Sequence, residues 1–334
     1  ALYFVGRRRV ELRTEAMPSP GEDEVLVQTV LSGVSGGTEL LLFRGEIPAP
    51  EGLDLDPIAG ALAYPTTFGY CAVGRVLQIG ADVDPGWQGR LVFGFQPHAS
   101  HFVAPLAALI PAPQGVTADA AVFLANLETA VNLVQDTGPL LGERILVLGQ
   151  GVVGLLTSAL LRKFPLELLL TADLHAIRRQ ASKDLGATVV LDPASPDFRS
   201  LALSHTGGTG IGFDAIVELT GNPSAVNDAI SLAAYSARIV MGSWFGSKAA
   251  PLELGGRYHR RRVRLISSQV STIAPELRGR WDKSRRFRVA WDTLGSIRPE
   301  RWITHRFPLE RAAEAYSLLD ESPEKAIQVV LTYN

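Results

Sequence analysis

The chain has 334 residues and a formal net charge of −2, and 46% of its residues are hydrophobic. This is the composition of an ordinary globular protein, and the small net charge excludes a general attraction to nucleic acids or anionic membranes. The single cysteine, Cys71, excludes an internal disulfide, and no apolar run is long enough to span a bilayer. We therefore expect a cytoplasmic protein, and the length favours two domains.

The first third of the chain has the pattern of short β-strands separated by turns. Extended runs are predicted within residues 2–31 and then over 70–79, 86–94, 101–104 and 108–110. A glycine-rich stretch at residues 32–40 leads into a short leucine-rich helix, and residues 44–66 are expected to form an exposed loop. This pattern predicts a β-rich domain, built as a partly open barrel.

From Thr117 onwards, predicted helices and strands alternate. Helices at 118–134, 155–163, 176–185 and 225–234 separate apolar strands at 145–148, 166–172, 188–191, 213–219 and 237–242. This order is typical of a parallel, doubly wound sheet, so the fold class is α/β with a second, β-rich domain. The last predicted elements are helices at 281–294 and 309–320 and a strand at 326–332.

One predicted strand, at residues 145–148, runs into a turn with the Gly-x-Gly-x-x-Gly spacing of dinucleotide-binding proteins. The first glycine permits the tight turn, the second lets the backbone approach a pyrophosphate, and the third lets the next helix pack close to the strand. The N-terminus of that helix offers N–H groups to the phosphates. The predicted cofactor-binding residues here are Gly149, Gln150, Gly151, Val152, Val153 and Gly154.

Asp173 ends the second strand of this predicted domain, where an acid can hydrogen-bond the 2′-hydroxyl of the adenine ribose. A carboxylate at that place disfavours the extra phosphate of NADP(H), so NAD(H) is the favoured cofactor. NADP(H) stays the alternative, since the nearby Arg178 or Arg179 can accept a 2′-phosphate.

Four stretches, at residues 20–27, 33–39, 69–76 and 142–149, resemble the medium-chain dehydrogenase/reductase superfamily, and the resemblance extends over essentially the whole chain. It implies a GroES-like catalytic domain at 1–126, a Rossmann domain at 127–267 and a return segment at 268–334 that completes the catalytic domain. It also implies hydride transfer in the cleft between the domains and a homodimer joined through the edges of Rossmann sheets. Further stretches are similar to the bacteriochlorophyllide-dehydrogenase-like branch, whose substrates vary: residues 35–39, 43–45, 126–130, 258–262 and 267–270.

Zinc-dependent members of this superfamily carry three metal ligands that this chain replaces. Their Cys-Gly-Thr-Asp stretch becomes residues 35–39, Ser-Gly-Gly-Thr-Glu, and their Gly-His-Glu stretch becomes residues 69–71, Gly-Tyr-Cys. The third ligand falls near Ala125 or Asn126. Serine, tyrosine and alanine or asparagine do not form a zinc site, so no metal is predicted. The alternative is a zinc site built from a different set of ligands, Cys71, His98, Glu128 and Glu39.

Without zinc, a hydrogen-bond donor must stabilise the negative charge that develops on the substrate. The resemblance puts Tyr70 in the place of a metal-ligating histidine, so Tyr70 is the first candidate for a proton donor or oxyanion stabiliser. The alternative is a half-buried packing role. Ser35 and Thr38 are candidates for a hydroxyl relay or, alternatively, for turn formation. Glu39 is either an acceptor behind this relay or an acid stabilised by its helix dipole.

Several other residues are candidates for the cofactor site. Thr129 matches a superfamily position beside the nicotinamide. Four residues follow the predicted Rossmann strands, whose carboxyl ends face the cofactor: Thr220, Gly242, Ser243 and Ser268. The arginine-rich runs at 257–264 and 278–288 either recognise an anionic group or form a solvated face.

These observations predict a zinc-independent oxidoreductase that transfers a hydride between a nicotinamide cofactor and an alcohol or ketone of a small organic molecule. The alternative within enzymes is reduction of an activated C=C bond, as in enoyl and quinone reductases that also lack zinc. The alternative from another class is a redox-sensing or structural NAD(P)H-binding protein.

Overall fold

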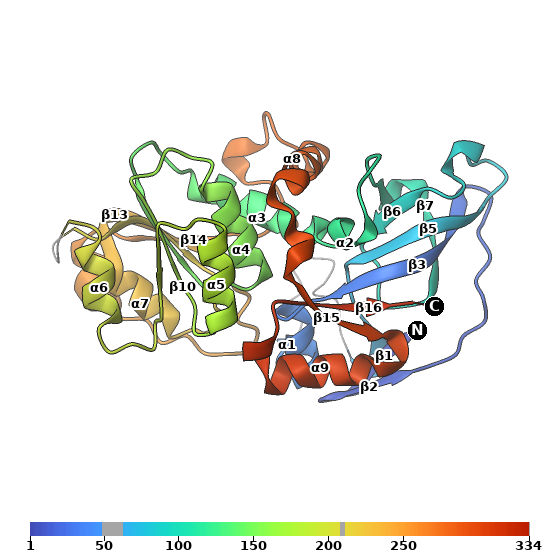
Figure 1. Cartoon of the computed structure of the whole chain (residues 1–334), viewed down its shortest axis with the longest axis horizontal. Helices are drawn as coiled ribbons and strands as arrows, with labels where there is room; N and C mark the ends of the chain where they lie inside the picture. Colours follow the sequence, from blue (N-terminus) through green and yellow to red (C-terminus); the bar gives the residue numbers. More distant parts are fainter. Residues whose placement is uncertain (49–62, 208–210, 334) are drawn as a thin grey trace. The chain divides into compact units, whose positions relative to one another are not determined.

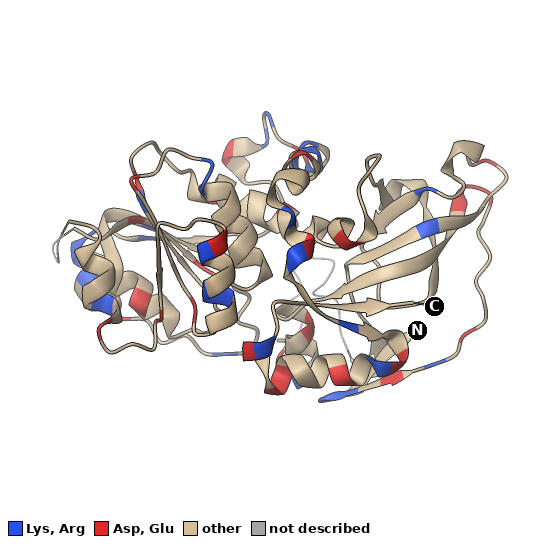
Figure 2. Ribbon diagram, in the orientation of Figure 1, with Lys and Arg blue, Asp and Glu red and all other residues tan. Residues whose placement is uncertain are grey.

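The computed structural model describes residues 1–48, 63–207 and 211–333, and the chain divides into two compact units (Figure 1). Unit 1 comprises Ala1–Ala125 and Arg298–Asn334, and unit 2 comprises Asn126–Ile297. Most of the loop predicted at residues 44–66 lies outside the described residues. Acidic and basic residues are interspersed in both units (Figure 2), in keeping with the small net charge. Among the described residues, no helix has the length and apolar character needed to cross a membrane.

Unit 1 is the predicted β-rich domain. A seven-stranded sheet has the order β15-β16-β3-β5-β6-β8, with β7 also paired to β3, and a smaller sheet has the order β2-β1-β4. The strands are β1 (Leu2–Gly6), β2 (Arg9–Leu12), β3 (Glu24–Val34), β4 (Thr66–Thr67), β5 (Ala72–Ile79), β6 (Leu91–Gly94), β7 (His101–Pro105), β8 (Leu109–Pro111), β15 (Ile303–Pro308) and β16 (Gln328–Thr332). The helices are α1 (Thr38–Arg44), α2 (Ala118–Ala121) and α9 (Ala312–Glu321).

Strand β3 is the centre of unit 1, because it pairs with β5, β7 and β16. Its residues Val25 and Val27 are fully buried in an apolar core with β5, β6 and β7. A second core contains Phe4, Phe43 and Tyr316 and joins β1, α1 and α9. The C-terminal strand β16 pairs antiparallel with β3, so the end of the chain completes the N-terminal sheet, as the resemblance implied.

Unit 2 is the predicted doubly wound sheet. Its strands are all parallel and have the order β11-β10-β9-β12-β13-β14, the strand order of a Rossmann fold. They are β9 (Arg144–Leu148), β10 (Leu168–Ala172), β11 (Val189–Leu191), β12 (Phe213–Glu218), β13 (Ala233–Met241) and β14 (Arg264–Ser267). The helices are α3 (Leu124–Thr137), α4 (Val152–Leu161), α5 (Ala176–Asp184), α6 (Phe198–Ser204), α7 (Ala225–Leu232) and α8 (Lys283–Ile297).

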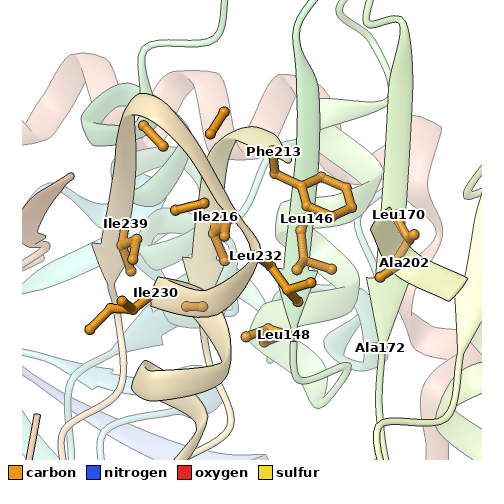
Figure 3. Packing of buried hydrophobic residues seen from close by; sticks show 14 of the residues in the cluster. Leu146, Leu148, Leu170, Ala172, Ala202, Phe213, Ile216, Ile230, Leu232 and Ile239 are labelled. Carbon is orange, nitrogen blue, oxygen red and sulfur yellow. The ribbon is translucent and has the colours of Figure 1, made fainter. Parts of the chain in front are cut away.

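The core of unit 2 lies between this sheet and its helices. Leu146, Ile216 and Ile239 stand side by side on three neighbouring strands and are fully buried, and Leu232 of α7 packs against them (Figure 3). Strands that are apolar on both faces belong in the middle of a sheet covered by helices on both sides. The continuous apolar runs in the sequence therefore correspond to the central strands.

Two predictions about chain organisation were wrong. The helix predicted at 118–134 is interrupted: α2 ends at Ala121 and α3 begins at Leu124, with Val122 and Phe123 in a turn between them. The predicted return segment 268–334 is too long, since residues 268–297 belong to unit 2. The reason is a buried ion pair: Arg286 of α8 donates from Nε and Nη2 to Glu128 Oε1 of α3, at 3.0 and 2.9 Å.

Candidate active site and cofactor site

The glycine-rich turn between β9 and α4 has the geometry that its spacing predicts. Gly149 has a φ of +91°, and a Cβ there would lie 2.5 Å from the carbonyl oxygen of Leu219. A Cβ at Gly154 would lie 2.0 Å from the carbonyl oxygen of Gly149, so only glycine lets α4 approach the turn. A Cβ at Gly151 meets nothing within 4 Å. Open space therefore lies beside the N-terminus of α4, which has no side-chain cap and is suited to a phosphate.

Asp173 lies against this turn. Asp173 is 6% exposed, and its carboxylate accepts hydrogen bonds from the backbone N–H of Gln150 (2.7 Å) and of His175 (2.8 Å). The Gln150 side chain is turned inward, where it donates to the Gly149 carbonyl and accepts from Ser158. The structure thus brings Asp173 and the glycine turn together, and it uses both the side chain and the backbone N–H of Gln150 within this turn.

The two arginines near Asp173 differ in their contacts. Arg179 donates to the carbonyl oxygens of Asp173 (2.8 Å) and Leu174 (2.7 Å), and it forms an ion pair with Asp192 (3.0 Å). Burial lowers the pKa of Arg178, and the charge of Asp173 opposes that shift. Arg179 is therefore held by partners within unit 2, whereas Arg178 is the arginine whose charge faces Asp173.

The other predicted cofactor residues gather at the carboxyl edge of the same sheet. Leu148, Glu218, Met241 and Ser267 are in register on β9, β12, β13 and β14, so the segments that follow these strands lie at one edge. Those segments contain Thr220, Gly242, Ser243 and Ser268. Ser243 Oγ accepts from Gly221 N–H (2.9 Å), and Ser268 donates to Asp136 (2.6 Å). Thr129 lies in α3, directly after Glu128.

Sequence reasoning missed Glu218, the last residue of β12. It is fully buried, and its Oε1 accepts from the backbone N–H (2.7 Å) and the hydroxyl (2.5 Å) of Thr220. Burial raises the pKa of Glu218, while the hydrogen bonds from Thr220 and Ser243 oppose the shift. Glu218 therefore fixes the loop that carries Thr220, a role that strand periodicity does not reveal.

In unit 1, Tyr70 and Ser35 form a hydroxyl pair. The Tyr70 hydroxyl donates to Ser35 Oγ (2.7 Å), which also accepts from the backbone N–H of Thr38 (3.2 Å). Burial is the main reason that the pKa of Tyr70 is raised, and the hydrogen bond to Ser35 opposes the shift. Tyr70 therefore stays protonated at neutral pH and acts as a hydrogen-bond donor. The structure brings together the three catalytic candidates, Tyr70, Ser35 and Thr38.

Behind this pair lies a buried polar network centred on Glu39. The Glu39 carboxylate accepts from Ser35 N–H (3.0 Å), from His98 Nε2 (3.0 Å) and from the hydroxyl of Tyr316 (2.5 Å). His98 Nδ1 in turn lies 2.6 Å from Ser32 Oγ. Glu39, His98, Ser32 and Tyr316 are all fully buried. Tyr316 was not a predicted site residue, because α9 is far from Glu39 in the sequence.

The residues present do not fit a zinc ion. Ser35 and Tyr70, which the resemblance puts at ligand positions, are hydrogen bonded to each other. Glu39 and His98, two of the alternative ligands, are also hydrogen bonded to each other. Within the described part of the chain, no three His, Cys, Asp or Glu side chains are grouped so as to hold a metal ion.

Comparison with known proteins gives one matching family model, described as zinc-binding dehydrogenase, at residues 152–286. The starvation-sensing protein RspB of Escherichia coli K12 is 23% identical over 352 residues, which cover 95% of this chain and 94% of RspB. The D-guloside 3-dehydrogenase of the same organism is 23% identical over 336 residues, 93% of each chain. Over nearly its whole length the chain is thus similar to these proteins, in keeping with its resemblance to the medium-chain dehydrogenase/reductase superfamily. The match to the zinc-binding family model lies within unit 2, so it does not cover Ser35 or Tyr70.

Solved structures of superfamily proteins have the same fold. The alcohol dehydrogenase RspB of E. coli CFT073, in complex with NADH, aligns with a TM-score of 0.79 and 21% identity over 99% of this chain and 98% of that chain. A putative zinc-binding dehydrogenase of Sinorhizobium meliloti 1021, bound to NADP, aligns with a TM-score of 0.80, the same identity and the same coverage. The predicted fold class, a Rossmann sheet plus a GroES-like β domain, is confirmed, as is the predicted class of oxidoreductase.

Proposed function

We propose that this protein is a zinc-independent, NAD(H)-dependent dehydrogenase that acts on a secondary alcohol or the corresponding ketone of a small organic molecule. The observation that carries the proposal is the Tyr70–Ser35 hydroxyl pair. The resemblance to the superfamily puts both residues at positions where zinc-dependent members have metal ligands. Relatives named D-guloside 3-dehydrogenase and L-galactonate-5-dehydrogenase support alcohol chemistry over reduction of a C=C bond.

The bound nicotinamide would supply the hydride acceptor or donor, and the protein's own groups would bind and orient it. Asp173 and the backbone at Gly151 and the start of α4 would hold its ribose and pyrophosphate. The carboxyl-edge loops with Thr220, Ser243 and Ser268, together with Thr129, would hold the nicotinamide half. This assignment rests on the open space at Gly151 and on the shared sheet edge.

Ser35 is the group best placed to donate to the substrate oxygen. Both acceptor positions of Ser35 Oγ are used, one by Thr38 N–H and one by the Tyr70 hydroxyl, so the proton of Ser35 is left to donate elsewhere. Tyr70 strengthens that donor because its own hydrogen bond polarises Ser35. With a raised pKa, Tyr70 serves as a donor that stabilises developing charge rather than as an acid that gives up its proton.

The proposed preference for NAD(H) rests on Asp173 and Arg179. The Asp173 carboxylate stands where a 2′-phosphate would be repelled, and Arg179 is held by Asp192 and two carbonyl oxygens. Calorimetric titration should therefore give a lower Kd for NADH than for NADPH. The opposite order would show that Arg178 binds the phosphate and overrides the repulsion.

The central experiment is Tyr70→Phe, assayed with a panel of secondary alcohols, ketones and enones. We expect the variant to retain NADH binding and to lose at least about tenfold in kcat, because the donor to Ser35 is lost. An unchanged kcat would show that Tyr70 has only a packing role. Activity confined to enones would instead establish C=C reduction. Metal analysis of the purified active enzyme should find no zinc, and stoichiometric zinc would refute the metal-independent mechanism.

A cytoplasmic location and a homodimer are part of the same proposal. The single cysteine, Cys71, is free and buried, so the described fold needs no oxidising compartment. Strand β14 ends the sheet of unit 2, and its outer edge has no partner strand among the described residues. Light scattering on the purified protein tests the dimer.

A further inference from the structure

The Glu39 carboxyl group is fully buried and hydrogen bonded to three different segments of unit 1. Ser35 N–H approaches Oε1, whereas His98 and the Tyr316 hydroxyl both approach Oε2. Burying a carboxylate costs several kcal/mol unless hydrogen bonds replace its water. The three donors meet that requirement and leave the side chain in one fixed orientation.

A reciprocal pair of hydrogen bonds joins Ser35 to the start of α1. Glu39 Oε1 accepts from Ser35 N–H (3.0 Å), and Ser35 Oγ accepts from Thr38 N–H (3.2 Å). This is the reciprocity of a capping box, with the acid one residue further along. Both the backbone and the hydroxyl of Ser35 are therefore fixed, and the Tyr70 hydroxyl bonds to the fixed oxygen.

Helix α1 has an apolar anchor that does not depend on Glu39. The four residues after Glu39 are each at most 4% exposed: Leu40, Leu41, Leu42 and Phe43. Apolar burial of this kind stabilises a helix against its core at far lower cost than a buried charge. A fully buried carboxyl group at Glu39 thus needs a reason other than anchoring the helix, and its hydrogen bond to Ser35 supplies one.

We infer that Glu39 is a positioning residue for the reaction: it fixes Ser35, and through Ser35 it sets the direction in which the Ser35–Tyr70 pair presents its proton. His98 and Tyr316 hold the second carboxylate oxygen and so fix Glu39 itself. This inference rests on the proposed function, because it takes the Ser35–Tyr70 pair as the donor to the substrate oxygen.

The test is a double-mutant cycle between Glu39 and Ser35. Glu39→Ala should lower kcat by about tenfold or more with KM little changed, because the donor is misdirected in the transition state. Glu39→Gln keeps an acceptor for Ser35 N–H and should recover most of this loss. In a Ser35→Ala background, Glu39→Ala should cost less than about twofold, because the group through which it acts is absent.

A matched control separates positioning from general destabilisation. Asp320 of α9 is 5% exposed, and it pairs with Arg8 and with Arg44 at the other end of α1. Asp320→Asn should therefore lower stability while leaving kcat within about twofold. The inference would be overturned if Glu39→Ala lowered kcat equally in the wild-type and Ser35→Ala backgrounds. It would also be overturned if Asp320→Asn lowered kcat as much as Glu39→Ala does.

Hydrogen–deuterium exchange gives a readout that does not depend on activity. The Ser35 amide should lose protection in Glu39→Ala and keep it in Glu39→Gln and Asp320→Asn. If Glu39→Ala does not fold, Glu39→Asp is used instead, because its shorter side chain keeps a carboxyl group but moves the acceptor oxygen away from Ser35 N–H. A wild-type enzyme inactive on the whole panel would refute the proposed function, and the positioning role with it. Unchanged Ser35 exchange would refute the positioning role alone.

Discussion

Two glycines of the same turn, Gly151 and Gly154, should respond to alanine in opposite ways. A methyl group at Gly154 would lie 2.0 Å from the Gly149 carbonyl oxygen and 2.9 Å from its carbon, so α4 must move away from β9. A methyl group at Gly151 meets nothing within 4 Å, and the residue's φ of −64° and ψ of −174° suit alanine. One substitution therefore strains the fold and the other fills the space intended for a phosphate.

The magnitudes follow from these two environments. Overpacking costs about 1–3 kcal/mol, and the upper end applies to Gly154→Ala because the obstacle is backbone. For a domain of this size class, that is a fall in Tm of about 5–10 °C. Gly151→Ala changes only a helix N-cap residue and should cost less than about 1 kcal/mol. Its effect should be on NADH affinity, with Kd raised at least about tenfold, equivalent to ~1.4 kcal/mol.

The assay combines calorimetric melting without cofactor and fluorescence titration with NADH. Melting must be done without NADH, because a bound ligand raises Tm by mass action. The expected pattern is a stable Gly151→Ala variant that binds NADH poorly and a destabilised Gly154→Ala variant. If Gly151→Ala binds NADH like the wild type, the open space beside α4 is not the pyrophosphate site. If it melts as low as Gly154→Ala, the assignment of the two glycines is wrong.

Three further predictions concern buried polar groups. Arg286→Met removes a fully buried cation from Glu128 and should lower the free energy of unfolding, measured with urea, by about 3 kcal/mol. Lys283→Met removes a 41%-exposed partner of the same carboxylate and should lower it by less than about 1 kcal/mol. Burial raises the pKa of Glu218 above its usual 4.5, so the folded state binds this proton more tightly than the unfolded state does. The stability that Glu218 contributes therefore falls as pH rises through the window above 4.5. Glu218→Gln should remove this dependence of the unfolding free energy on pH, and an unchanged dependence would contradict the prediction. Burial also raises the pKa of Cys71, so native protein should resist iodoacetamide that labels the unfolded chain.

The parts of the molecule that sequence reasoning predicted are those set by local rules. Gly149 and Gly154 are required by backbone geometry within a few residues, so their spacing alone indicates the turn. The strands of unit 2 are apolar on both faces and alternate with helices, which is a pattern with a fixed period. The shared position of Ser35, Thr38 and Tyr70 came from the resemblance and not from any period in the sequence.

The parts that were missed depend on contacts between distant residues. Glu39 meets His98 across 59 positions and Tyr316 across 277, and a single sequence gives no sign of either contact. The end of unit 2 was placed too early for the same reason. It depends on Arg286 pairing with Glu128 across 158 positions, a buried ion pair that looks in the sequence like one more arginine in a basic run.

The surroundings of Tyr70 also restrict how the proposed reaction can proceed. Burial is the largest cause of the raised pKa of Tyr70, and the nearby Cys71 and Glu39 add to it. A negative charge that disfavours a tyrosinate also disfavours a free alkoxide held against Ser35. Neutral donors can share charge with a substrate oxygen but cannot balance a full negative charge as a zinc ion does. In the proposed mechanism, Ser35 therefore stabilises the substrate oxygen by a hydrogen bond, and the proton that balances hydride transfer is exchanged with water.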